Sequence, residues 1–189
     1  MIIIQTKKSI NQYPRRYKVK EMKVHPGWTF FNKSVEYAKI HFMAEKAYVD
    51  IHNARSQEYR QKLEKILEQG VDPFDKIFLG QFDEKEILYE TEHWFAFLNQ
   101  HQYPGTQYQF VIVTQKYMEH FEELPIGAIT DLFALAQKIC HEYDIPGGGL
   151  TMRFGDTVFS GATVKHLHAQ LIVPEKGKKV CVWFGSENK

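Results

Sequence analysis

The sequence predicts an α+β fold in which an antiparallel sheet packs against one long helix, with an α-helical extension before it. After a helical pattern from Ser34 to about Gly70, the apolar spacing changes from Ile77 on to a succession of short β-type segments. A single long helical segment interrupts them, so the order reads β-β-β-α-β-β. This order, after an α-rich extension, indicates an α+β fold with an antiparallel sheet.

Length and composition indicate a globular chain with one main domain. The 189 residues are 43% hydrophobic and 14% aromatic, which is enough apolar material for a core. The net charge of +1 predicts no general attraction to nucleic acid or to a membrane surface. No apolar run approaches the roughly 20 residues that span a bilayer. We expect an N-terminal basic arm and helical extension over residues 1–75 and a catalytic domain over residues 76–189.

The two cysteines favour a reducing, cytoplasmic location. Cys140 and Cys181 lie far apart in the sequence and form no Cys-x-x-Cys element. The apolar start, Met1 to Ile4, is too short for a secretory signal.

The first 75 residues contain a basic stretch and two helical patterns. Residues 7–23 carry seven Lys or Arg against one acid, which could contact a polynucleotide, but a solvated arm or a packed edge is the favoured interpretation. Nucleic acid is therefore not the expected partner, and processing of nucleic-acid ends stays the last-ranked alternative. A helical pattern runs from Ser34 to about Gly70, with a break near His52 and a second helix over Ser56–Gln69.

The second part alternates strands with one helix. A helix opens at Pro125 and continues to Tyr143. The predicted strands are Glu86–Glu90, Trp94–Leu98, Tyr108–Thr114, Leu150–Phe154, His166–Val173 and, at the end, Val180–Phe184.

The run from Thr163 to Val173 alternates polar and apolar residues with the period of a strand. His166, His168 and Gln170 therefore share one face, and Leu167, Ala169 and Leu171 share the other. Two imidazoles and a carboxamide in a row indicate a pocket that uses imidazole chemistry. The alternative is an ordinary solvent-exposed polar face.

The segment Ser160–Val173 resembles the signature of the histidine triad (HIT) superfamily, in its His-x-His-x-Gln form with apolar spacers. Upstream matches occur in the family's order. Phe95–Asn99 resembles the strand whose last residue contacts the ribose, and Pro104-Gly105 with Phe110–Val113 resembles the Pro-Gly strand. The resemblance covers about Ile77–Pro174 and implies a HIT-like fold that binds nucleotides.

The resemblance implies site residues as well. His168 corresponds to the nucleophile, which attacks an α-phosphorus to give a nucleotidyl-histidine, and His166 corresponds to its orienting partner. Gln170 completes the catalytic set. The implied substrate-binding residues are the ribose contact Asn99, Gln109, the cation Arg153 and a phosphate loop formed by Ser160, Gly161, Ala162 and Thr163.

Three departures from the family pattern limit this transfer. Gln170 replaces the third histidine of hydrolases and cannot titrate. Gln109 stands where the Pro-Gly strand usually has a histidine, and the phosphate loop lacks side-chain amides. We expect a hydrolase acting on a nucleotide or dinucleoside polyphosphate. A phosphorylase or nucleotidyltransferase and a binding module with little catalysis remain alternatives.

No metal or other cofactor is expected. The family's Cys-Pro-Phe-Cys element reads Asp72-Pro73-Phe74-Asp75 here, and carboxylates replace thiolates poorly in a tetrahedral zinc site. Because family members often pair through the long helix and an edge strand, a homodimer is a further expectation.

Overall fold

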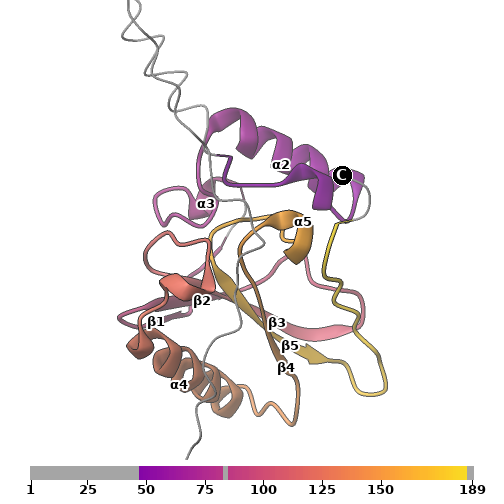
Figure 1. Ribbon diagram of the computed structural model, residues 1–189. Helices are drawn as coiled ribbons and strands as arrows, with labels where there is room; N and C mark the ends of the chain where they lie inside the picture. Colours follow the sequence, from indigo (N-terminus) through magenta and orange to yellow (C-terminus); the bar gives the residue numbers. More distant parts are fainter. Residues whose placement is uncertain (1–46, 83–84, 187–189) are drawn as a thin grey trace, which may run out of the picture. The chain divides into compact units, whose positions relative to one another are not determined.

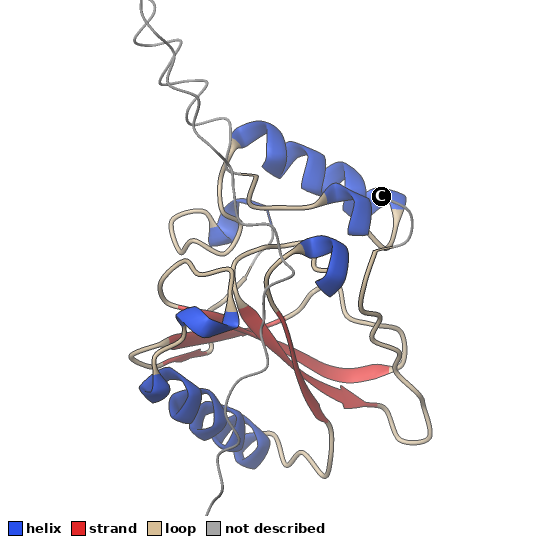
Figure 2. Ribbon diagram, in the orientation of Figure 1, coloured by secondary structure: helices blue, strands red, loops and turns tan. Residues whose placement is uncertain are grey.

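The computed structural model describes residues 47–82 and 85–186, all of which belong to one compact unit. The basic arm and most of the first predicted helix lie outside these residues. The described part is a five-stranded antiparallel sheet with helices on both faces (Figures 1 and 2). The predicted α+β class is thus confirmed. The strands are β1 (Tyr89–Glu90), β2 (Trp94–Leu98), β3 (Thr106–Thr114), β4 (Gly149–Arg153) and β5 (His168–Pro174).

The strand order is β1-β2-β3-β5-β4, so the strand with the signature histidine lies between β3 and β4. His168 stands opposite Val113 of β3 and Arg153 of β4, and Gln170 stands opposite Val111. The helices and helical turns are η1 (Ile51–Asn53), α2 (Gln57–Gln69), α3 (Leu79–Phe82), η2 (Phe121–Glu123), α4 (Ile126–Glu142) and α5 (Thr157–Ser160).

One face of the sheet is covered by α4, whose bounds agree with the predicted helix (Figure 1). Pro125 is the N-cap residue, and its carbonyl accepts from the Ala128 N–H at 2.9 Å. The Trp94 indole N–H donates to the Ala128 carbonyl at 2.7 Å and ties β2 to the helix. Leu167, Ala169 and Leu171 lie in this core, as the period-two pattern predicts.

The other face is covered by α2 and the segment that follows it. Ser56 accepts a hydrogen bond from the Tyr59 N–H at the start of α2, and Gly70 ends the helix at φ 62°. Leu63 and Ile66 of α2 join Phe74 in a core with residues of β2 and β3. The described part of the extension, residues 47–75, therefore shares a core with the sheet.

Several details differ from the sequence predictions. Residues 47–50 are not helical, because Val49 pairs with Val164 and η1 begins only at Ile51. The first strand shrinks to Tyr89–Glu90, and β5 begins at His168, two residues later than predicted. Residues 180–184 form no strand. Trp183 and Phe184 are exposed there, and the Trp183 carbonyl accepts from Arg153 instead of from a ladder partner.

Candidate active site

His168 is the first residue of β5, and burial makes its side chain a neutral base. The residue is 7% exposed, and Nδ1 of its imidazole lies 2.8 Å from the His166 carbonyl oxygen. A carbonyl can only accept, so Nδ1 carries the proton and Nε2 keeps a lone pair. Burial lowers the pKa of His168 to about 4 despite that hydrogen bond, and the charges of His166 and Arg153 act in the same direction. At neutral pH the ring is uncharged.

His166 precedes β5 and is held on both ring nitrogens. Its Nδ1 lies 2.6 Å from the Asp72 carboxylate, and its Nε2 lies 2.9 Å from the Thr114 carbonyl oxygen and 3.0 Å from the Thr114 hydroxyl. Only 2% of the residue is exposed. The alternative of a solvent-exposed polar face is therefore wrong for both histidines.

Gln170 is oriented by a second glutamine behind it. The Tyr103 N–H donates to Gln109 Oε1 at 2.9 Å, which leaves the Gln109 amide N–H to donate to Gln170 Oε1 at 3.0 Å. The Gln170 amide nitrogen is consequently a hydrogen-bond donor toward the site. Gln109 itself is fully buried and does not line the cavity, so its expected contact with substrate is replaced by a contact with Gln170.

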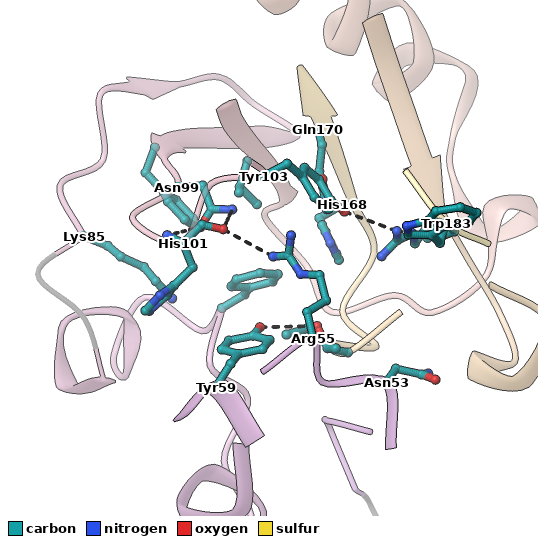
Figure 3. Close-up of a pocket in the computed structure, with 16 residues that line it drawn as sticks. Asn53, Arg55, Tyr59, Lys85, Asn99, His101, Tyr103, His168, Gln170 and Trp183 are labelled. Carbon is teal, nitrogen blue, oxygen red and sulfur yellow. Dashed lines mark hydrogen bonds between the residues drawn. The ribbon is translucent and has the colours of Figure 1, made fainter. Parts of the chain in front are cut away.

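A cavity of about 110 Å³, here called the inner cavity, opens beside His168 (Figure 3). Of the predicted site residues, Asn99, Arg153, Thr163, His168 and Gln170 line it. His166 does not, because its ring turns toward Asp72. The cavity brings together residues from the extension, the sheet and the C-terminal segment, including Asn53, Arg55, Tyr59, Phe74, Lys85, Phe97, His101, Tyr103 and Trp183.

The inner cavity is electropositive. Arg55, Lys85 and Arg153 line it, and none of the described residues in its wall is Asp or Glu. Arg55 lies in the middle of the group, between Tyr59 and the strand of His168 (Figure 3). Its guanidinium stacks on the Tyr103 ring at 4.1 Å and donates to the His101 carbonyl. Cations without neighbouring acids suit an anionic ligand.

The expected phosphate loop is not an open anion cradle. The Gly161 N–H donates to the Thr157 carbonyl, and the Ala162 N–H donates to the Ser160 hydroxyl. Ser160 and Ala162 are buried, and Gly161 lies against Gly185, so these three residues do not line the cavity. Only Thr163 does, with its hydroxyl 3.3 Å from the Tyr59 hydroxyl. The positive charge at the cavity therefore comes from the side chains of Arg55, Lys85 and Arg153, whereas backbone N–H groups of this loop were expected.

Asn99 and Arg153 lie at the cavity but are engaged with the protein. The Asn99 amide accepts from the His101 N–H and donates to the His101 carbonyl. Arg153 donates to the Trp183 carbonyl at 2.7 Å and to the Tyr103 hydroxyl at 3.2 Å. Both residues therefore shape the wall of the cavity whether or not they touch a ligand.

Several lining residues were missed because they come from segments outside the family resemblance. Arg55 and Tyr59 belong to the extension, and Trp183 belongs to the C-terminal segment that was expected to be a strand. The role of Asp72 could have been found from the sequence. Asp72 replaces a cysteine of the family's metal-binding element, and a carboxylate at that position can pair with a histidine.

The residues that replace the cysteine element do not fit a zinc ion. Asp72 uses one oxygen for His166 and the other for the Phe74 N–H, and Asp75 accepts from the Ile77 N–H. Within residues 47–82 and 85–186, no group of three or more His, Cys, Asp or Glu side chains could hold a metal ion. In the same residues, no helix combines the length and the apolar character needed to cross a membrane.

Comparison with solved structures finds several histidine triad proteins, of which three are described here. A HIT family hydrolase from Clostridium thermocellum is 22% identical, with a TM-score of 0.46, over 58% of this chain and 95% of that one. A histidine triad nucleotide-binding protein from Candida albicans is 18% identical, with a TM-score of 0.47, over 63% and 86%. The diadenosine triphosphate hydrolase of Plasmodium falciparum is 24% identical, with a TM-score of 0.41, over 51% and 65%.

A comparison with curated proteins gives no match. The model of one protein family does match: the HIT domain aligns with residues 82–177, just over half of the chain. This range contains β2 to β5, α4 and all three signature residues. The chain belongs to the histidine triad (HIT) family.

Proposed function

We propose that the protein is a nucleotide-binding hydrolase that cleaves its substrate at the α-phosphate through a nucleotidyl intermediate on His168. The observation that carries this proposal is the state of the His168 ring. The imidazole is neutral, its Nδ1 proton is bound to the His166 carbonyl, and its Nε2 lone pair is left on a ring that lines an electropositive cavity. A neutral nitrogen beside cations is suited to attack phosphorus.

The reaction consists of two displacements. In the first, Nε2 of His168 forms a bond to the α-phosphorus while the bond to the leaving-group oxygen breaks with its electron pair. The imidazole becomes positively charged, and its Nδ1–H bond to the His166 carbonyl stabilises that charge. In the second, water attacks the phosphorus, loses a proton to solvent, and releases the nucleoside monophosphate and the neutral ring.

The lining groups supply charge stabilisation in both steps. Phosphoryl transfer depends mainly on positioning and on stabilising charge on the non-bridging oxygens. Arg55 and Lys85 are the cations that can face those oxygens, and the Gln170 amide N–H can donate to one of them because Gln109 fixes its orientation. A carboxamide cannot protonate the leaving group, so solvent must do so.

Because Gln170 cannot act as an acid, a second enzyme class is also considered. A phosphorylase or nucleotidyltransferase would resolve the same intermediate with an acceptor other than water. Orthophosphate distinguishes the two: turnover that requires it supports the phosphorylase, and turnover that is indifferent to it supports the hydrolase. Nucleotide binding with neither adduct nor product would instead support a regulatory module.

The central experiment is trapping of the adduct. The protein is mixed with a nucleoside 5′-phosphoramidate and with a dinucleoside polyphosphate, quenched, and analysed by mass spectrometry of its peptides. We expect the nucleotidyl group on His168, and no adduct in His168→Gln. His141→Gln is the matched control, since His141 is exposed on α4, which covers the opposite face of the sheet. Unchanged turnover in a folded His168→Gln protein would overturn the mechanism.

A further inference from the structure

A second cavity, here called the rear cavity, is lined by Asp72 and His166, the pair that does not line the inner cavity. Its volume is about 150 Å³. Asp75 and Lys76 also line it, and both are exposed, so the rear cavity opens to solvent at these two residues. The remaining lining residues are Phe74, Phe95, Gln115 and Tyr117.

The rear cavity suits water. Its wall contains the carboxylates of Asp72 and Asp75, the ammonium group of Lys76 and the imidazole of His166. A cavity holds ordered water where polar groups offer it hydrogen bonds, and roughly 10–15 Å³ accommodates one molecule. The rear cavity therefore has both the room and the partners for several water molecules.

The inner cavity has the opposite character. Arg55, Lys85 and Arg153 line it, and no acidic side chain of the described residues does. Its nucleophile depends on the exclusion of water, because burial is the main cause of the low pKa of His168. Water or a carboxylate beside this ring would favour its protonated form, which cannot attack phosphorus.

Phe74 stands between the two spaces. Among the described residues it alone lines both cavities, and it is 7% exposed. The centre of its ring lies 5.1 Å from that of His168 and 6.2 Å from that of His166. Phe97 packs against it at 5.8 Å, and the Lys85 ammonium group lies 5.2 Å from its centre. One aromatic ring, held by several neighbours, therefore separates a wet, acidic space from the nucleophile.

We infer that Phe74 is a positioning residue that closes the rear cavity against His168, so that the acceptor which resolves the nucleotidyl-histidine has to enter through the inner cavity. This inference rests on the proposed function, which supplies the adduct. In the resolving step the acceptor oxygen bonds to phosphorus, the N–P bond breaks with its electron pair on Nε2, and the acceptor proton goes to solvent. A path from the rear cavity would let water take this step whatever acceptor occupies the inner cavity.

The test measures formation and breakdown of the adduct separately, in single turnovers of a nucleoside 5′-phosphoramidate without orthophosphate. Phe74→Ala joins the two cavities. Adduct formation should slow, because His168 loses its packing, whereas breakdown by water should accelerate about twofold or more, because a second path of entry is added. Phe74→Leu leaves part of the partition and should change both rates in the same directions, but less. Phe95→Leu is the matched control, since Phe95 is buried and lines only the rear cavity of the two.

A purely structural role of Phe74 would slow breakdown as well as formation, and that result would overturn the inference. Unchanged breakdown in Phe74→Ala, or an equal acceleration in Phe95→Leu, would overturn it too. If Phe74→Ala does not fold, Phe74→Leu and Phe95→Leu decide between these outcomes.

A measurement on the resting protein separates this inference from the proposed function. NMR titration of the His168 ring needs no turnover. The ring should titrate above about pH 5 in the Phe74 variant, compared with about 4 in the wild type, because water then reaches it. His166, Arg153 and Asp72 also act on this ring and are present in both proteins. An unchanged titration would refute the partition. If the wild type forms no adduct, the proposed function fails, and the titration alone decides whether Phe74 seals the ring.

Discussion

The carboxylate of Asp72 lies 2.6 Å from Nδ1 of His166, although the two residues are 94 positions apart in the sequence. This contact joins the segment after α2 to the signature segment. The His166 carbonyl accepts the Nδ1 proton of His168, so the position of the nucleophile depends on the placement of His166. Phe74, two residues after Asp72, packs edge-on against the His168 ring at 5.1 Å. The Asp72–Phe74 segment therefore supports both histidines.

The first prediction concerns Asp72→Asn. Asp72 accepts two hydrogen bonds, one from the Phe74 N–H and one from His166, and an Asn side chain has only one acceptor oxygen. We expect a loss of about 1–3 kcal/mol in the free energy of unfolding, because the charged acceptor of a buried hydrogen bond with His166 is replaced by a neutral amide. Misplacement of His168 should slow adduct formation by about 10- to 100-fold. Urea denaturation and rapid-quench kinetics measure the two effects.

Asp75→Asn is the control for this variant. Asp75 is exposed and its oxygen accepts from the Ile77 N–H, a bond that Asn can keep. Its stability and its rate of adduct formation should stay close to wild type. A similar loss in both variants would show that Asp72 has no special role in positioning.

The contrast between α2 and Asp72 shows what sequence patterns could predict. Helix α2 was predicted to within one residue because Ser56 and Gly70 mark its ends locally. The bounds of α4 and of β2 were also predicted to within one residue. The alternation from Thr163 to Val173 also predicted that Leu167 and Leu171 point into the core.

Contacts between distant segments could not be predicted in that way. Nothing local in Arg55 or Trp183 indicates that both reach the cavity of His168. The loop at Gly161 and Ala162 has the composition of a phosphate cradle, but α5 and Ser160 use its N–H groups. Which hydrogen bonds a backbone makes depends on the conformation it adopts, here the short helix α5, and residue type alone does not report it.

The second prediction is a pH-dependent contribution of His168 to stability. Burial lowers the pKa of His168 from 6.5 to about 4 in the folded protein. Between these values the unfolded chain binds more protons than the folded chain, so stability decreases as the pH falls from about 6.5 to 4. The contribution is about 3 kcal/mol over this window. It should be fully present above pH 7.

His168→Gln isolates this contribution, since the other titrating groups remain in both proteins. Urea denaturation from pH 8 to 4 should show the free energy of unfolding of the wild type falling by about 3 kcal/mol relative to the variant. Parallel pH profiles would contradict the buried neutral state. Adduct formation on the wild type should show no loss from protonation of the nucleophile between pH 8 and about pH 5.

The third prediction concerns the orientation of Gln170. Gln109→Met removes the donor to Gln170 Oε1 and lets the Gln170 amide rotate. The amide N–H would then face the substrate only part of the time, so kcat/KM should fall by about tenfold. Gln107→Met is the control because Gln107 lies on the same strand but is exposed. An equal effect of both changes, or none from Gln109→Met, would argue against orientation of Gln170 by Gln109.

The fourth prediction follows from the inability of Gln170 to donate a proton to the leaving group. Without a protein acid, the rate of adduct formation should depend steeply on the leaving group's own pKa. A series of aryl esters of one nucleoside 5′-phosphate measures this slope. Gln170→His introduces a titratable ring at the same place beside Gln109, and its slope should be shallower below about pH 6.5, where an ordinary imidazole is protonated. Aryl esters with the poorest leaving groups should gain most. If the slopes of the wild type and of Gln170→His coincide, another group in the cavity already protonates the leaving oxygen, and His101, which lines the inner cavity, is the first to replace.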